Sequence, residues 1–291
     1  MSSLSLYLAA VLIWGSTWLA ITFQFGKVAP TVSVAYRFAL ASVLLFAWCG
    51  LRRLNLRFSA REHAAIALQG LLLFGLNYVC VYQAETQISS GLVAVVFSLI
   101  LFLNILGTRV FFATPVRPAI LVGALLGVAG VALLFLPEIG RGEGNARSLL
   151  GLTIALVGTV SASLGNLLSA RNQRRGLPVV QINAFGMLYG ALAVGLYAWM
   201  SGEAFVFDTS VRYLLSLGYL ALFGSVIAFG AYLTLVGRIG ADRAGYSAAI
   251  IPVVALILSG LFEGLNWQVA TVAGIALCLA GNVLVLRCRA K

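Results

Sequence analysis

The sequence contains very little charge. Only 9% of its 291 residues are charged, and 62% are hydrophobic. A typical soluble domain is about 25% charged and no more than about half apolar. So few charged side chains cannot cover a protein of this length in water. This composition excludes a soluble protein and requires lipid to cover much of the surface.

The groups that catalysis and metal binding require are also scarce. His63 is the only histidine, and the eight acidic residues form no pair inside an apolar run. Metal-dependent chemistry requires clusters of His, Asp, Glu or Cys at ligand spacing. The four cysteines have neither zinc-finger nor disulfide-framework spacing. We therefore expect no catalytic residue, no metal site and no cofactor, which disfavours an integral-membrane enzyme.

The basic excess does not indicate nucleic-acid binding, although the net charge is +11. The basic residues lie in short clusters between apolar runs, such as Arg52-Arg53 and Arg174-Arg175. A nucleic-acid groove requires a contiguous basic face. Short basic clusters between apolar runs are instead typical of cytoplasmic loops. We expect no nucleic-acid partner.

Long apolar runs dominate the chain, and a helix needs about 20 such residues to cross a bilayer. The candidate spans are 5–26, 33–51, 63–84, 89–108, 117–136, 149–170, 179–200, 211–236, 244–262 and 267–287. These runs are continuously apolar and do not alternate, which favours helices over a barrel. The sequence therefore predicts an all-α integral membrane protein with ten transmembrane helices.

The distribution of Lys and Arg predicts the orientation. With a cytoplasmic N-terminus, fourteen basic residues fall in inside loops or tails, four fall outside, and Arg37 lies within a span. The four outside are Lys27, Arg141, Arg147 and Arg212. Because cytoplasmic loops carry the excess of Lys and Arg, both termini are predicted to be cytoplasmic.

The chain also shows a weak internal repeat between residues 4–137 and 148–287. The stretch Gly123 to Gly130 is similar to Gly274 to Gly281. The same comparison places Tyr78 opposite Tyr232, and Ser98 opposite Pro252. Each half holds five spans, an odd number, so the second half begins on the other side of the membrane. Inverted repeats around a central cavity are typical of alternating-access carriers.

These residues resemble a known family, the EamA-type branch of the drug/metabolite transporter superfamily. The resemblance is carried by Trp14-Gly15-Ser16, Pro30 and Arg37-Phe38, and in the second half by Pro252 and Gly260-Leu261-Phe262-Glu263. It implies a ten-helix bacterial inner-membrane carrier that exports amino acids or other metabolites. Within the family the chain is most similar to the aromatic amino-acid exporters.

Two positions depart from the family pattern. Ser98 replaces an expected proline, so a kink at Pro252 would lack its counterpart in the first half. Arg109 replaces an expected acidic residue, whereas Glu263 keeps it in the second copy. A gating scheme with two equivalent halves is therefore in doubt.

Polar and aromatic residues that recur on helix faces are the candidates for a substrate cavity. They are Trp14, Thr17, Phe74, Asn77, Tyr78, Tyr82, Ser98, Ser161, Ser163, Asn166, Phe229 and Tyr232. A small zwitterion needs hydrogen-bonding groups for its head and an apolar wall for its side chain. Packing between helices is the competing interpretation of each residue. The expected partners are a neutral or zwitterionic amino acid and the lipid bilayer, with the protein a monomer or weak dimer.

Charges within the membrane are the first place to look for gating or coupling. Arg37 is predicted either to snorkel toward the outer interface or to form a gating ion pair with Glu263, and Pro252 is a candidate gating residue. Glu85 and Glu263 fall at span ends, so the sequence offers no acid at depth. We therefore expect facilitated transport that is not coupled to protons. A proton-coupled exporter of drugs or other metabolites and a passive channel remain as alternatives.

Overall fold

The computed structural model describes residues 2–113, 118–135, 143–239, 247–265 and 267–289, and over these residues it contains helices and no strand. The helices in chain order are α1 Ser3–Thr22, α2 Pro30–Leu51, α3 Ala60–Gly70, η1 Leu71–Leu76, α4 Asn77–Glu85, α5 Ser90–Phe97, α6 Ile100–Phe112, α7 Pro118–Phe135, α8 Glu143–Arg174, α9 Val179–Met200, α10 Val211–Tyr219, η3 Leu220–Ile227, α11 Ala228–Ile239, α13 Ser247–Phe262 and α14 Val269–Arg289. The prediction of an all-α membrane protein is confirmed at this level.

Within the residues that the structure describes, seven helical stretches are long and apolar enough to cross a membrane. They are Ser3–Thr22, Pro30–Leu51, Ala60–Glu85, Ser90–Phe111, Ala146–Arg174, Val179–Met200 and Val211–Tyr232. Three shorter apolar helices, Ile120–Leu134, Ile250–Phe262 and Val269–Val285, fall within the other three predicted spans. Residues 138–142 of the predicted boundary between the halves, and 244–246 of the ninth span, lie outside the described residues.

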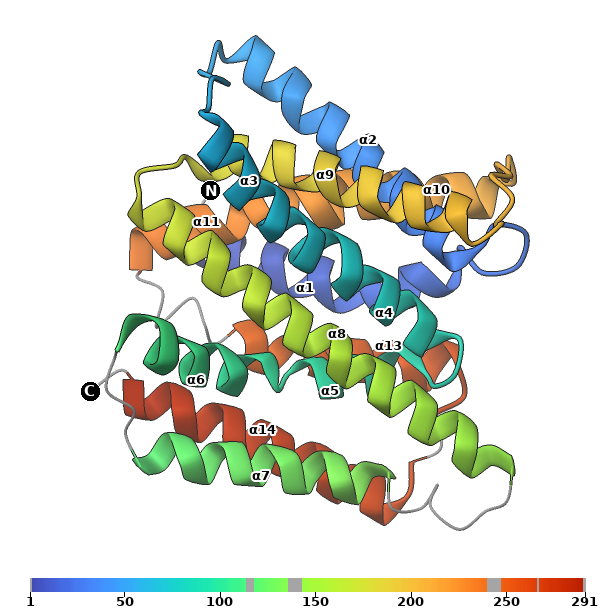
Figure 1. Cartoon of the computed structure of the whole chain (residues 1–291). Helices are drawn as coiled ribbons and strands as arrows, with labels where there is room; N and C mark the ends of the chain where they lie inside the picture. Colours follow the sequence, from blue (N-terminus) through green and yellow to red (C-terminus); the bar gives the residue numbers. More distant parts are fainter. Residues whose placement is uncertain (1, 114–117, 136–142, 240–246, 266, 290–291) are drawn as a thin grey trace.

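The helices pack in pairs drawn from the two halves of the chain (Figure 1). The closest partners are α7 with α14, and α2 with α9. In addition, α1 packs on α13 and on α11, while α8 packs on α5, α6 and α4. Most of the packing is therefore between the halves, so the first half depends on the second for its buried surface.

Glycines allow α7 and α14 to approach closely. A Cβ on Gly130 would lie 2.6 Å from the carbonyl oxygen of Gly274, and a Cβ on Gly123 would lie 2.8 Å from that of Gly281. Both distances are too short for a Cβ atom, so a larger residue at either position would clash with the facing helix. Small residues at such positions let the backbones of two membrane helices come into contact. Gly123 and Gly130 of α7 therefore serve helix packing inside one molecule, against α14.

The segments η1 and η3 are π-helical and lie in the third and eighth predicted spans. A wider turn leaves carbonyl groups that need donors from elsewhere. Ser161 of α8 donates to the Leu72 carbonyl at 2.8 Å, and the Trp14 indole of α1 donates to the Gly224 carbonyl at 3.1 Å. Helices of opposite halves therefore stabilise each π segment.

The fourth predicted span breaks at Ser98–Leu99, between α5 and α6. The Ser98 hydroxyl donates to the Val95 carbonyl at 2.7 Å, and the amide of Leu99 donates to Val96 at 3.1 Å. A serine that bonds back to its own helix bends it, and shortened turns tighten it locally. Conversely, α13 runs through Pro252 as one helix. The prediction that only the second half is distorted here was wrong, because a serine can also interrupt a helix.

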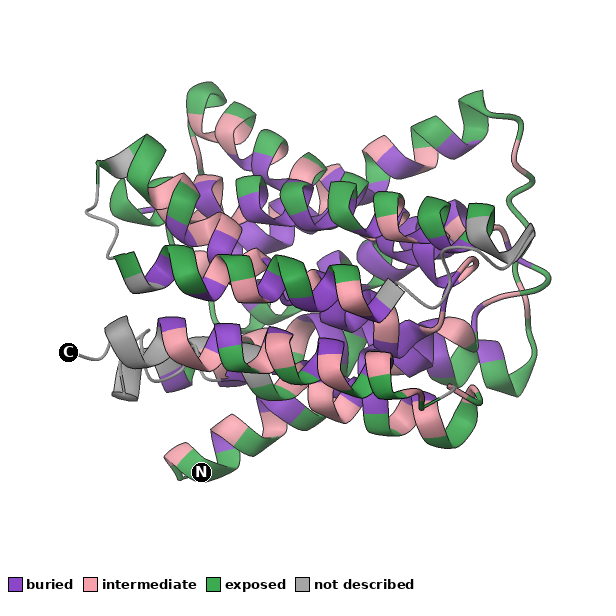
Figure 2. Cartoon of the chain, turned by 90° about the horizontal axis from the view of Figure 1, so that it is seen from below, coloured by how far each residue is buried: buried purple, intermediate pink, exposed green. Residues whose placement is uncertain are grey.

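Buried and exposed residues divide each helix lengthwise (Figure 2). Buried positions face the neighbouring helices, and exposed positions form the outer surface. Large apolar side chains are numerous on that surface, including Trp48, Trp199 and Val269. A water-soluble monomer rarely exposes apolar surface on this scale. This outer surface is suited to contact with lipid.

Candidate functional site

A cavity of about 380 Å³ lies between the two halves of the chain. Its walls come from α1, η1, α4, α5, α6, α8, α9, α11 and α13. It reaches the surface beside Gln173, a lining residue that is exposed near the end of α8. This volume falls in the range of about 300–1,000 Å³ that is usual for small-molecule sites. We call the end of the bundle beside Gln173 the open end.

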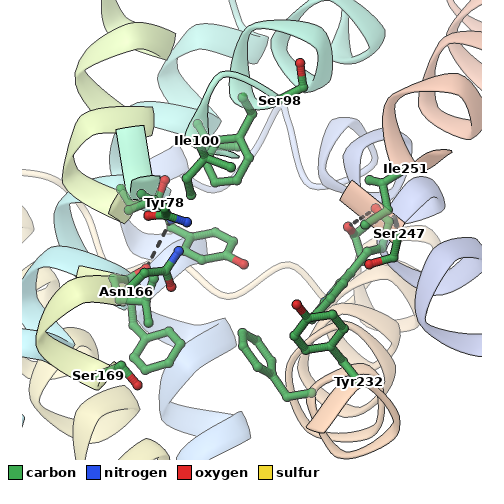
Figure 3. A pocket seen from close by; sticks show the side chains of 18 of the residues that line it. Tyr78, Ser98, Ile100, Asn166, Ser169, Tyr232, Ser247 and Ile251 are labelled. Atoms are coloured by element: carbon green, nitrogen blue, oxygen red, sulfur yellow. Dashed lines mark hydrogen bonds between the residues drawn. The ribbon is translucent and has the colours of Figure 1, made fainter. Parts of the chain in front are cut away.

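The cavity combines an aromatic wall with uncharged polar groups. The Trp14 ring lies 5.1 Å from that of Phe229 and 5.3 Å from that of Tyr232, and Phe74 lies 6.3 Å from Phe229. In Figure 3, Tyr78 and Asn166 face Tyr232 and Ser247 across the cavity. Among the described residues, none of those lining the cavity carries a formal charge. The cavity therefore suits a ligand without a strong net charge.

Nine of the twelve predicted binding residues line this cavity. They are Trp14, Thr17, Phe74, Asn77, Tyr78, Ser98, Asn166, Phe229 and Tyr232. Whether they bind substrate stays a prediction. Their shared location reflects the helical spacing of the aromatic and polar positions, which places them on the inner faces of their helices.

The other three predicted binding residues do not line the cavity. The Tyr82 hydroxyl is fully buried and donates to the Gln24 side-chain oxygen at 2.8 Å. The Ser161 hydroxyl donates to the Leu72 carbonyl at 2.8 Å, and Ser163 is buried outside the cavity lining. Residues two apart, such as Ser161 and Ser163, lie on different faces of a helix, and four-residue spacing, as from Tyr78 to Tyr82, drifts around its axis.

Several polar lining residues were not among the predictions. They are Asn104, Ser169, Gln173, Asn183 and Ser247. Asn104 and Asn183 lie within apolar spans, where an amide is costly unless it has a partner or a function. An asparagine inside an apolar run was therefore a signal from which the sequence could have predicted these two cavity residues. Gln173 and Ser247 fall at helix ends, and only the tertiary structure shows that they face the cavity.

Two buried amide oxygens of the cavity lack a hydrogen-bond partner among the described residues. They are Oδ1 of Asn77 and Oδ1 of Asn104. The amide nitrogen of Asn77 is already used, since it donates to the Leu73 carbonyl at 3.1 Å. A buried acceptor without a donor is costly. These two oxygens could accept hydrogen bonds from N–H or O–H groups of a bound molecule.

The opposite end of the bundle is closed, and we call it the closed end. There α1 and α4 end and α5 begins. Tyr82 binds Gln24, and both the amide and hydroxyl of Ser90 donate to the Glu263 carboxylate, the amide at 3.2 Å. The rings of Trp18 and Phe97 meet at 5.3 Å on the cavity side. These contacts separate the cavity from the surface at this end.

Arg37 does not have the environment that either prediction assigned to it. Its side chain is only 1% exposed, so it does not reach an interface as a snorkelling residue would. Its guanidinium lies 4.6 Å from the centre of the Tyr78 ring, and its Nε donates to the Ser225 hydroxyl at 3.4 Å. Between the described side chains there is no Arg37–Glu263 ion pair within 4 Å, because Glu263 is bound to Ser90.

Glu85 corrects a second expectation, that the chain holds no acid at depth. It is the last residue of α4, yet its side chain is only 7% exposed. Both carboxyl oxygens lack a hydrogen-bond partner in the part of the chain that the structure describes. The position at a span end had suggested exposure to water. The helices that pack on α4, which include α2, α5 and α8, leave it buried.

Comparison with known proteins agrees with this architecture. The sequence model of the EamA-like transporter family matches residues 1–136 and 149–287, which is nearly the whole chain in two copies. An Escherichia coli protein called "Uncharacterized inner membrane transporter YedA" is 32% identical over 252 residues, covering 86% of this chain and 79% of the relative. Protein PagO of Salmonella typhimurium is 23% identical, covering 89% of this chain and 84% of its own length.

A solved crystal structure shares the fold. It superposes with a TM-score of 0.70 at 20% sequence identity, covering 98% of this chain and 96% of the other. At this identity the likeness concerns the fold alone.

Proposed function

Because the chain belongs to the EamA-like transporter family, and so is a multi-pass membrane transporter, we propose that it carries neutral or zwitterionic amino acids by alternating access. Aromatic and other neutral amino acids are the favoured substrates. The observation that carries this proposal is the uncharged, aromatic-walled cavity between the two halves, open at one end and closed at the other. Access from one side at a time is the requirement of such a carrier.

We further propose that the chain forms ten spans arranged as two inverted five-helix repeats. The packing pattern supports this. Exchanging the halves turns the contact of α1 with α13 into that of α8 with α5 and α6, and the contact of α1 with α11 into that of α8 with α4. It also exchanges the Gly123–Gly281 approach with the Gly130–Gly274 approach. The π segments of the third and eighth spans follow the same exchange.

The proposed location is the bacterial inner membrane with both termini in the cytoplasm. The name of the Escherichia coli relative supports the membrane, and the excess of basic residues in the predicted inside loops supports the orientation. The open end would then face the cytoplasm, because α8 and α9 meet there through Arg171, Arg174 and Arg175. Export of a cytoplasmic metabolite would begin from this conformation.

The proposed transport is facilitated, with the substrate gradient as its driving force. The described residues that line the cavity hold no ionisable carboxyl or imidazole that a proton and a substrate could share. Glu85 is buried but does not line the cavity. A carrier whose substrate and proton compete for one site would place its acid in the cavity wall.

The test is uptake of labelled amino acids into proteoliposomes that contain only this protein, without an ion gradient. We expect saturable uptake that aromatic and bulky neutral amino acids compete away, and acceleration by unlabelled substrate on the opposite side. Flux that neither saturates nor shows counterflow would identify a channel. Uptake that requires an imposed proton gradient would overturn facilitated transport and favour the proton-coupled alternative.

A further inference from the structure

Glu85 is the only acidic side chain that is buried among the residues the structure describes. Neither of its oxygens receives a hydrogen bond from any described group. A buried carboxylate without partners is so costly that the group normally takes up a proton instead. The geometry around Glu85 therefore favours the neutral acid in this conformation.

The charged groups that act on Glu85 are Glu263 and Arg37. Glu263 directly follows α13, and Arg37 belongs to α2. The Arg37 guanidinium lies 4.6 Å from the centre of the Tyr78 ring and also interacts with the Tyr82 side chain. Among the described side chains of α8, Arg147 is a charged residue at this end; it is exposed and donates to the Thr86 carbonyl at 3.2 Å. Arg147 therefore binds the loop that follows Glu85, and it is not among the charged groups that act on Glu85.

These groups hold one positive charge and up to two negative charges. Glu263 receives two hydrogen bonds from Ser90, which stabilise its ionised form. Glu85 receives none. With Arg37 and Glu263 charged and Glu85 neutral, the cluster of the buried Arg37 and Glu85 with the half-buried Glu263 has no net charge. Ionising Glu85 would leave one uncompensated negative charge beside a like charge, the arrangement that a shared proton relieves in carboxylate pairs.

The cluster lies where the two halves of the chain meet at the closed end. Glu85 and Arg37 belong to the first half, while Glu263 and Ser225 belong to the second. Opening this end requires the contacts of Ser90 with Glu263 and of Arg37 with Ser225 to separate. Separation would admit water to Glu85, and hydration stabilises the ionised carboxylate. Protonation and closure are therefore linked.

We propose that Glu85 is a proton-binding site that controls the closed end of the transporter. It holds a proton while that end is closed and releases it to the same side when the end opens. A state that binds protons more tightly is favoured as the proton concentration rises. Acid at that face therefore keeps the end closed, and a higher pH allows it to open. The proton regulates the step and is not carried across, so facilitated transport is retained. The proposal rests on the alternating-access function above.

The first test measures the proton directly and requires no substrate. Infrared spectra of the reconstituted protein are recorded near neutral pH for the wild type, E85Q and E203Q. The matched control, Glu203, is a partly exposed acid of the same end that accepts a hydrogen bond from Thr31. We expect the carbonyl band of a protonated carboxylic acid in the wild type and E203Q, and its loss in E85Q.

A wild type without that band, or an E85Q protein that keeps it, would overturn the proposal. If E85Q does not fold, carbon-13 labelling of glutamate in the wild type replaces it. The band must then shift to lower frequency, and a band that does not shift would rule out Glu85.

The second test measures exchange of labelled amino acid while the pH at the closed-end face is varied. A difference of one pKa unit between two states corresponds to about a tenfold change in their ratio. We expect the wild-type and E203Q rates to fall by up to about tenfold per pH unit on acidification. E85Q, which resembles the protonated form, should exchange slowly at every pH.

An E85Q profile that matches the wild type would refute the regulatory role. If no variant exchanges amino acids while the infrared band is present, the proposed substrate fails and the proton site stands.

Discussion

The closed end and the open end are built from the same helices but differ in how far the cavity extends toward the surface. At the closed end, hydrogen bonds such as Ser90–Glu263 and Arg37–Ser225 connect the halves, and several of the groups are fully buried. At the open end, hydrogen bonds such as Asn172–Gln69 also connect the halves, but the cavity reaches the surface beside the exposed Gln173. Polar contacts therefore join the halves at both ends, and only at the closed end do they lie between the cavity and the surface.

The two halves also place different residues at matching positions near the two ends. Glu263 binds Ser90 at the closed end, whereas its counterpart Arg109 in the first half is exposed. The halves also differ in shape, since the first breaks between α5 and α6 while α13 is one helix. The comparison teaches that two copies of one module can differ in both charge and helix continuity at matching positions.

Among the substitutions that test the closed end, the largest loss of transport and stability is expected at Arg37. R37L would leave Glu263 and Glu85 without the buried positive charge, and removal of one partner from a buried charged cluster costs about 3–5 kcal/mol. We expect the exchange rate in proteoliposomes to fall more than about tenfold, together with a lower temperature of unfolding. R147Q changes an exposed arginine at the same end and should leave both values near wild type. An R37L protein that transports normally would remove Arg37 from the gate.

A smaller effect is expected on the cavity side, at Tyr78. Its ring lines the cavity and also supports the Arg37 guanidinium. Loss of an aromatic surface from a binding site costs about 1–1.5 kcal/mol, so Y78A should raise the half-saturation concentration for uptake about tenfold. Membrane insertion should be unchanged. Y197A, which removes an exposed tyrosine of α9, serves as the control. Unchanged uptake by Y78A would count against the cavity as the binding site.

Removing one neutral hydrogen bond tests whether a single contact stabilises the closed end. Y82F deletes the bond to Gln24, which is worth about 1 kcal/mol. Hydrogen exchange of the amides in residues 86–89 should then become up to about fivefold faster. Y213F loses a similar buried hydroxyl, bonded to Ser33, between α2 and α10 and should not change those amides. Equal acceleration in both variants would mean that the Tyr82–Gln24 contact has no special role in closure.

The smallest effect is expected outside the cluster, at Asp208. The amide of Ser210 donates to its carboxylate and lowers the pKa of Asp208 below its ordinary value. Because the folded state favours the ionised form, this contribution is present above the ordinary pKa and is lost as the pH falls through the lowered one. D208N should therefore lower the thermal midpoint slightly at neutral pH and not in strong acid, without changing transport. A difference that persists in acid would contradict this origin.

Much of the architecture follows from local features of the sequence. The apolar runs predict the helices because crossing lipid demands continuous apolar length, and nine of the predicted cavity residues share one space because helical spacing places them on inner faces. The break at Ser98 was missed because a serine bends a helix only when its hydroxyl binds a carbonyl of the preceding turn. The burial of Glu85 was missed because its position at the end of α4 does not reveal which other parts of the chain pack around that end.

By itself the sequence determined that this protein is embedded in a lipid bilayer and that its spans are helical, and it predicted that the second half repeats the first. Those properties depend on composition and on spacing along a single helix. Only the tertiary structure decided which end is closed, that Arg37 and Glu85 share a buried cluster, and that Glu263 is bound by Ser90. The physical reason is that burial and charge interaction are set by distances between helices, and residues far apart in the chain supply both partners.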